Sequence, residues 1–166
     1  MGAILCFGDS NTWGWHEDGR FPRDVRWPGV LRSLLPADWE VVEEGLGGRR
    51  ASDALAYFDP CVRSHEPLDV VVLFLGVNDP DADTAAAGIG ELVTHARAVG
   101  VPRVLVVAPP GYTSAFRPVC DELLDLDGRV AFRADDPIHL DAGAHRALAH
   151  AVAEQLALDD SRGRPG

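Results

Sequence analysis

Three residues of this sequence have the side-chain types that nucleophilic acyl chemistry needs. Ser10 ends a short apolar run near the N-terminus, and Asp136 and His139 lie three residues apart in the last third of the chain. A serine hydroxyl is a weak nucleophile unless a base takes its proton, and that base needs an acid to orient it. Pro137 restricts the backbone between Asp136 and His139, so one loop can present both side chains. The pattern predicts a nucleophile, an acid and a base.

Attack on a carbonyl creates an oxyanion, which needs hydrogen-bond donors fixed in advance. Three groups are candidates: the N–H of Ser10, the N–H of Gly48 and the side-chain amide of Asn78. Gly48 suits this role because a residue without a Cβ lets the backbone approach a ligand closely. We expect these three groups to form the oxyanion hole.

Each signal also has an ordinary structural explanation. Gly-Asp-Ser is a common strand exit, two adjacent glycines form turns, and Asn-Asp-Pro ends strands. Asp136 and His139 alone are compatible with a loop hydrogen bond or half of a metal site, but no second His or Cys pair lies near enough to complete a metal shell. We therefore expect no metal and no organic cofactor, and we interpret the other histidines as surface or packing residues. What favours chemistry is that four weak signals occur in one order along the chain.

The elements that must position these residues follow from the apolar pattern. Strand-length apolar runs occur at residues 3–7, 39–42, 68–75 and 103–108, and most are continuous, as in strands buried on both faces. Segments with helical spacing separate them, so the sheet is parallel and helices cover both faces. Ligands of such sheets bind at the carboxyl ends of the strands, where Ser10, Gly48 and Asn78 all fall. We expect the first strand to lie between the second and the third.

The C-terminal third is less regular. Asp141 is a good N-cap for a final helix whose apolar stripe includes Leu148 and Val152. Before it, we expect a short helix over residues 119–124, an Asp-Gly turn and a weak fifth strand over residues 129–132. We find no linker that marks a second domain, so residues 1–158 form one domain and residues 159–166 a flexible polar tail.

Length and charge limit the function classes. At 166 residues the chain fits one domain, and its net charge of −11 repels a phosphate backbone, so we expect no nucleic acid partner. The longest apolar run is far below the roughly 20 residues that span a bilayer, and no secretory signal precedes the first strand. We therefore expect no membrane partner and a cytoplasmic location. Cys6, Cys61 and Cys120 are odd in number and widely spaced, which favours reduced thiols.

Four motifs together resemble the SGNH, or GDSL-type, serine hydrolases: "FGDSN", "EEGLGGR", "LGVND" and "DPIH". The resemblance covers nearly the whole chain. It implies the SGNH hydrolase fold, a three-layer α/β/α sandwich with a parallel sheet of four to five strands in flavodoxin-like order. It also implies that Ser10 is the nucleophile, that Asp136 and His139 complete the triad, and that Gly48 and Asn78 join the Ser10 amide in the oxyanion hole.

The stretches "ILCFGDSNTWGW", "DVRWPGVL" and "VLVVAPP" are similar to the small bacterial arylesterases of this family, some of which transfer acyl groups to alcohols. Two features depart from that subgroup. Asn11 stands where the family usually has leucine, and residues 111–135 are shorter than the subgroup's loop, helix and fifth strand. In the subgroup that region walls the acyl pocket and helps to assemble oligomers. The resemblance therefore does not carry over the subgroup's substrate preference or its quaternary state, and a homo-oligomer is left open.

The resulting prediction is a serine esterase or deacylase that hydrolyses small, acetyl-type esters through an acyl-enzyme on Ser10. An acyltransferase that uses the same acyl-enzyme is one alternative, and a non-catalytic flavodoxin-like module that binds a phosphate or nucleotide is another. No Walker lysine or Gly-x-Gly-x-x-Gly pattern supports that module. Trp13 and Trp15 either line the substrate site or pack beneath the loop. The expected partner is a small-molecule ester.

Overall fold

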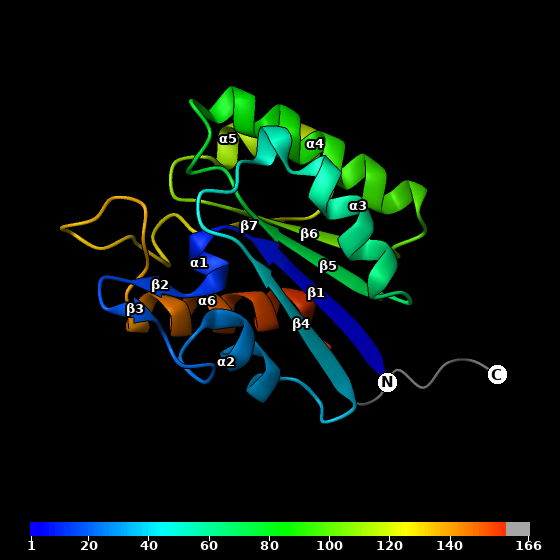
Figure 1. Cartoon of the computed structure of the whole chain (residues 1–166), viewed down its shortest axis with the longest axis horizontal. Helices are drawn as coiled ribbons and strands as arrows, with labels where there is room; N and C mark the ends of the chain where they lie inside the picture. Colours follow the sequence, from blue (N-terminus) through cyan, green and yellow to red (C-terminus); the bar gives the residue numbers. More distant parts are fainter. Residues whose placement is uncertain (159–166) are drawn as a thin grey trace.

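Five parallel strands form the central sheet of the computed structural model, which describes residues 1–158 (Figure 1). The predicted tail lies outside the described residues. In spatial order the strands are β4 (Trp39–Gly45), β1 (Gly2–Gly8), β5 (Val70–Phe74), β6 (Arg103–Ala108) and β7 (Leu123–Asp125). All four adjacent pairs are parallel. The predicted parallel sheet, with the first strand between the second and third, is confirmed.

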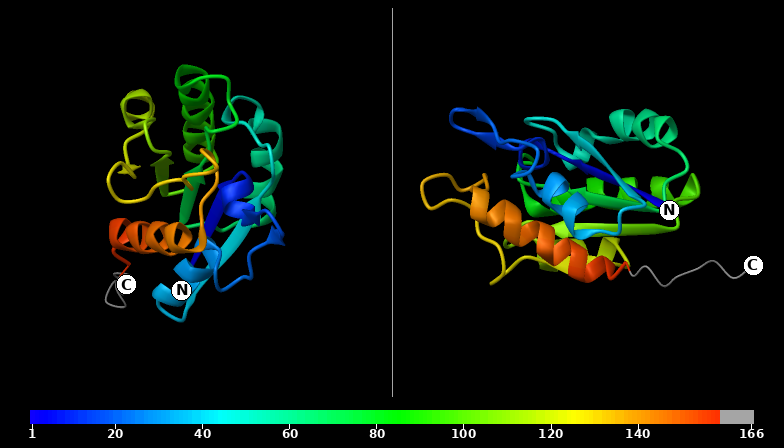
Figure 2. Two further views of the ribbon diagram at one scale, coloured as in Figure 1. Left: turned by 90° about the vertical axis from the view of Figure 1, so that its left-hand side faces the viewer. Right: turned by 90° about the horizontal axis from the view of Figure 1, so that it is seen from below.

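Helices cover both faces of this sheet (Figures 1 and 2). On one face lie α2 (Trp27–Leu34) and α6 (Ala142–Leu156), and on the other lie α3 (Leu55–Ser64), α4 (Ala82–Ala98) and α5 (Thr113–Phe116). Short elements connect them: α1 (Ser10–Trp13), the hairpin of β2 (Trp15–His16) and β3 (Gly19–Arg20), and the 3-10 helices η1 (Ala51–Asp53) and η2 (Arg117–Val119). No helix among residues 1–158 is both long and apolar enough to cross a bilayer.

The core explains why the strands are continuously apolar. Successive side chains of β1 point to opposite faces, so Leu5 and Phe7 pack toward α3 and α4, while Ile4 and Cys6 pack toward α2 and α6. All four are fully buried. Cys6 therefore packs in the first strand, and none of the three cysteines forms a disulfide.

The region before the last helix differs from its sequence prediction. Residues 119–124 are not a helix, because η2 ends at Val119 and β7 begins at Leu123. Residues 129–132 are not a strand; Val130 packs into the core from a loop, just after a turn at Gly128 whose φ is 75°. Three-residue β7 is too short to show a strand period, and its two leucines read equally well as a helix.

Three segments meet at the carboxyl ends of the strands. Helix α1 follows β1 directly, the β2–β3 hairpin follows α1, and residues 133–140 return to the same edge before α6 (Figures 1 and 2). Asp141 caps α6 as predicted, since its side chain accepts a hydrogen bond from the N–H of Ala144 at 2.7 Å. Residues far apart in the sequence are thereby collected at one place.

Candidate active site

The exit of β1 has a local structure that presents Ser10 at the start of α1. A Cβ on Gly8 would lie 2.1 Å from the Thr12 hydroxyl and 2.8 Å from the backbone oxygen of Phe74, so only glycine fits there. The Asp9 carboxylate caps α1 by accepting from the N–H of Asn11 at 2.9 Å. Ser10 is 5% exposed and lies two residues beyond the end of β1, at the carboxyl edge of the sheet.

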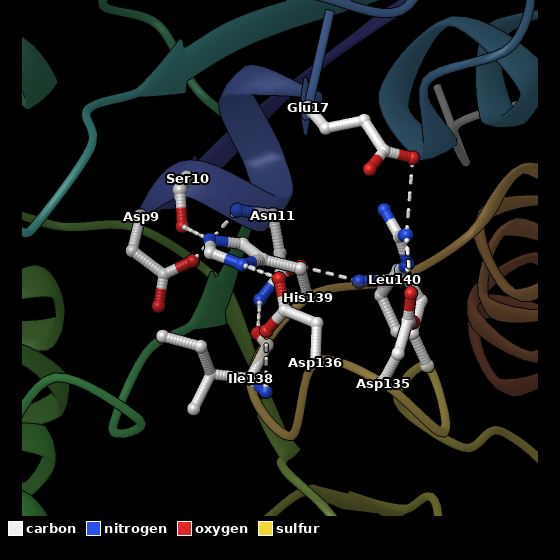
Figure 3. A network of polar contacts seen from close by, with 10 residues as sticks. Asp9, Ser10, Asn11, Glu17, Asp135, Asp136, Ile138, His139 and Leu140 are labelled. Atoms are coloured by element: carbon white, nitrogen blue, oxygen red, sulfur yellow. Dashed lines mark hydrogen bonds and ion pairs between the residues drawn. The ribbon is translucent and has the colours of Figure 1, made fainter.

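Ser10, His139 and Asp136 form one chain of hydrogen bonds, as predicted from their types (Figure 3). The Ser10 hydroxyl lies 3.0 Å from Nε2 of His139, and Nδ1 of His139 lies 2.6 Å from Oδ2 of Asp136. Burial alone would raise the pKa of Asp136, but hydrogen bonds from His139 and from the N–H of Ile138 outweigh it and hold that pKa below its ordinary value. Asp136 is therefore a carboxylate that orients His139 with Nε2 free to accept a proton.

The two predicted aromatic residues lie beside this triad in different ways. Trp15 stacks on the His139 ring, with centroids 3.9 Å apart and an angle of 26° between the planes. Trp13 has its ring covered by the guanidinium of Arg20, 5.0 Å from the ring centroid. Both indoles are half-buried. Their predicted contact with substrate stays a prediction.

Two of the expected oxyanion donors, Gly48 and Asn78, lie in the turns that follow β4 and β5. Gly48 has a φ of 75°, in the left-handed region that favours glycine, and it is exposed. Its neighbour Arg49 ties this turn to the end of β1 by donating from Nη1 to the carbonyl of Gly8 at 3.0 Å. The Asn78 amide donates to the carbonyl of Arg49 at 3.1 Å. The turns after β4 and β5 are therefore joined beside the nucleophile.

Sequence reasoning missed three residues that support this arrangement. Arg49 was given no role; its guanidinium lies 4.2 Å from the Phe7 ring centroid, and burial lowers its pKa. Asp79 was assigned to a turn, yet it is 7% exposed and accepts from the N–H groups of Ala51 and Ser52. The signal for both was a charged residue directly beside a glycine or asparagine assigned to the site.

The third missed residue is Asn11, whose amide bonds to the loop that carries His139. Asp9, on the other side of Ser10, is 2% exposed, and burial raises its pKa to about 7 although the Asn11 N–H and the charge of Arg49 oppose this rise. Buried polar residues on both sides of a nucleophile need partners. The position of Asn11 directly after the predicted nucleophile was therefore the sequence signal that its amide would have bonding partners.

One group of described residues offers metal-binding atoms. Glu44, Cys61 and His65 place one ligand atom each within 4.8 Å of one another. However, the Arg49 guanidinium acts electrostatically on both Cys61 and Glu44, so its positive charge opposes a cation there. Burial raises the pKa of the Cys61 thiol to about 12, which makes loss of its proton to a metal harder still. The group does not contact the triad through any of the hydrogen bonds described above.

The comparison with known families identifies the class of this protein. The model of the GDSL-like lipase/acylhydrolase family matches residues 6–154, nearly the whole chain. The chain belongs to this family. The predicted SGNH resemblance is confirmed, and so is the class of carboxylic ester hydrolase.

Individual relatives agree with this assignment. The native aryl esterase of M. smegmatis is 32% identical with a TM-score of 0.82, and Est24, a carbohydrate acetylesterase from Sinorhizobium meliloti, is 30% identical with a TM-score of 0.82. Both alignments cover 95% of this chain and 99% of the other. An uncharacterized lipoprotein, YqeF of Bacillus subtilis (strain 168), is 31% identical over 77 residues, which are 46% of this chain and only 31% of that protein.

Proposed function

We propose that this chain is a serine esterase that hydrolyses small acetyl-type esters through an acyl-enzyme on Ser10. The observation that carries the proposal is the continuous hydrogen-bond chain from Ser10 through His139 to Asp136. Such an arrangement activates a hydroxyl without a metal or an organic cofactor. The named activities of the two solved structures, an aryl esterase and a carbohydrate acetylesterase, support the same chemistry.

In the acylation step, the Ser10 oxygen attacks the ester carbonyl while its proton passes to Nε2 of His139. Asp136 holds the other ring nitrogen and stabilises the imidazolium that forms. The carbonyl oxygen becomes an oxyanion, and we assign its binding to the N–H groups of Ser10 and Gly48 and to the Asn78 amide. Protonated His139 then gives its proton to the leaving alkoxide or phenoxide, which departs as an alcohol or phenol.

In the deacylation step, a water molecule repeats the attack on the acyl group. His139 takes a proton from this water, the second tetrahedral intermediate collapses, and the proton returns to the Ser10 oxygen, which releases the carboxylic acid. The His139 and Asp136 side chains are 14% and 22% exposed, so the triad keeps contact with solvent. Water therefore has access to the acyl-enzyme, and we predict hydrolysis rather than transfer to an alcohol.

The acyl group that fits is small. We assign the acyl pocket to Trp13 and Trp15, and Trp15 is already stacked on His139. Acetyl esters of an aryl alcohol or of a sugar hydroxyl meet this limit. Supplying an aryl acetate and a primary alcohol in dilute buffer, and measuring acetate against the new ester, tests the prediction; a majority of new ester would show that the site excludes water.

Covalent labelling of Ser10 tests the proposal directly. A fluorophosphonate probe followed by intact mass measurement should give one adduct on the native chain and none on Ser10→Ala. Hydrolysis of a short aryl acetate should fall nearly to background in Ser10→Ala and in His139→Ala. Because the triad acts as a unit, the double variant should be little worse than either single one. No adduct on the native chain, under conditions that label a control hydrolase, would favour the non-catalytic binding module.

A further inference from the structure

The loop that carries His139 has few bonds that place it relative to Ser10. Residues 133–140 contain no helix or strand. Backbone bonds inside the loop run from the N–H of Arg133 to the carbonyl of His139 and from the N–H of Asp136 to the carbonyl of Arg133, and side-chain bonds join Arg133 to Asp135 and Asp136 to both Ile138 and His139. These bonds give the loop its own shape. They do not determine how far the imidazole lies from the nucleophile, so a contact to the body of the protein has to do so.

Asn11 supplies that contact (Figure 3). Its Nδ2 donates to the carbonyl of Ile138 at 2.8 Å, and its Oδ1 accepts from the N–H of Leu140 at 3.0 Å. The two backbone groups belong to the residues immediately before and after His139. Asn11 is 2% exposed and Leu140 is 1% exposed, so the bond between them is shielded from water, and the bond to Ile138 is partly buried.

Two bonds on opposite sides of one residue constrain its orientation as well as its distance. Asn11 bonds one acceptor, the carbonyl of Ile138, and one donor, the N–H of Leu140. A side-chain amide matches this pair because it carries both a donor nitrogen and an acceptor oxygen. Without Asn11, the buried N–H of Leu140 would lose its partner, and an unmet buried donor is costly. Two other contacts reach the loop: Trp15 stacks on the His139 ring, and Arg133 forms an exposed and therefore weak ion pair with Glu17, which is 68% exposed.

We propose that Asn11 is a positioning residue that sets the distance between His139 and Ser10. Ser10 and Asn11 are the first two residues of α1, so one short rigid segment carries both the nucleophile and the side chain that holds the base. This inference depends on the proposed function, in which His139 takes the proton of Ser10. Its consequence is that the amide acts on the chemical step and not on substrate binding.

Asn11→Leu and Asn11→Asp test this role to different degrees. Leucine has a similar size and removes both bonds. Aspartate keeps an oxygen for the N–H of Leu140 but sets a second oxygen against the carbonyl of Ile138. We expect Asn11→Leu to lower kcat for an aryl acetate, and the rate of fluorophosphonate labelling at Ser10, by about 100-fold, the scale of a misplaced catalytic group. KM should stay close to its native value, and Asn11→Asp should fall between the native protein and Asn11→Leu.

Thr12→Val is the matched control for a purely structural effect. Thr12 is the next residue of α1, fully buried, and its hydroxyl accepts from Nε1 of Trp27 at 3.3 Å, away from the loop. Its loss should lower the free energy of unfolding but leave kcat and the labelling rate near native values. All rates are compared per folded molecule, with the free energy of unfolding measured by urea for each variant.

The outcomes separate this inference from the proposed function. If the native chain shows neither turnover nor labelling, the proposed function fails first. If the native chain is active and Asn11→Leu labels at a rate within about threefold of it, Asn11 does not position His139 and the inference is overturned. If Thr12→Val loses as much activity as Asn11→Leu, or if neither Asn11 variant folds, the role of Asn11 is structural and the inference is likewise overturned.

Discussion

His145 joins two helices inside the core, and its protonation should control stability in mild acid. It is fully buried on α6, and its Nδ1 accepts from the N–H of Trp27 at 3.2 Å. Trp27 is the first residue of α2, whose N-cap Arg26 provides no side-chain cap, so His145 satisfies a helix N–H that has no other partner there. A neutral imidazole makes this bond and a protonated one cannot, since both of its nitrogens are donors.

The size of the effect follows from the pKa of His145. Burial, aided by the charge of Arg26 and opposed by that of Asp141, lowers this pKa from 6.5 to about 4. The unfolded chain therefore binds the proton more readily than the folded one between these values. The stabilisation is fully present above 6.5 and is lost as the pH falls through about 4. At about pH 5 the free energy of unfolding is lower by about 2 kcal/mol, relative to pH values above 6.5, because of His145 alone.

Asp9 acts in the opposite direction over part of the same range. Burial raises its pKa from 3.8 to about 7, so its contribution to stability is fully present below 3.8 and is lost as the pH rises through about 7. The native chain alone thus shows a mixture of two slopes. A variant that lacks only the imidazole keeps Asp9 unchanged, and the difference between native chain and variant isolates His145.

His145→Leu is the perturbation, and urea unfolding at about pH 7.5 and about pH 5 is the assay. At the higher pH the variant should be less stable by about 1–3 kcal/mol, because the N–H of Trp27 is left buried without a partner. At the lower pH the gap should shrink by about 2 kcal/mol, since the unfolded native chain gains a proton on its imidazole and the variant has no imidazole to protonate. His150→Gln, exposed on the same helix, should show no such change. A gap for His145→Leu that is equal at both pH values would refute the reasoning.

Three further predictions concern the site. Asn78→Ala should lower kcat/KM by a factor equivalent to about 2.7–4 kcal/mol of lost transition-state stabilisation, the scale of one lost oxyanion donor. An effect confined to KM would argue against that role. Asp136→Asn should lose most turnover whereas Asp135→Asn, which bonds Arg133 instead of His139, should stay near native; the reverse order would reassign the acid. Gly45→Ala should destabilise the chain in thermal melts, because its Cβ would lie 2.1 Å from the backbone nitrogen of the last residue of α1, while Gly47→Ala, with open space around it, should not.

Much of the fold was predictable because its strands are buried on both faces. The run Arg103–Ala108 was predicted with the bounds that β6 has, and Val70–Phe74 lies inside its predicted run. The prediction was right for the Asp-Gly turn but failed on either side of it, where a short 3-10 helix and a three-residue strand replace the expected helix and a loop replaces the expected strand. Their positions depend on what each side chain meets in three dimensions, such as the packing of Leu124 beside Val107, and no local period records that.

The site was predictable to the extent that its residues perform different tasks. Nucleophile, acid and base could be assigned from Ser10, Asp136 and His139 because acyl chemistry limits the side chains that can serve. The supporting residues were missed because their partners are backbone groups, which any sequence contains. Asn11 bonds two peptide groups more than 120 positions away, and Asp79 bonds two others across a turn. Contacts of this kind are visible only after the chain is folded.

The five residues after the first strand's apolar run explain why polar groups are buried there. Gly8 leaves room for the Thr12 side chain, Asp9 caps α1, and Asn11 bonds the loop of His139. Thr12 accepts a bond from Trp27, which anchors α1 to α2. Ser10 lies among four neighbours that each have a partner of their own, so its hydroxyl is the one left to share a proton with the imidazole. A buried polar run is stable when each member is paired, and here the bonds of Asn11 also hold the loop of His139 beside the nucleophile.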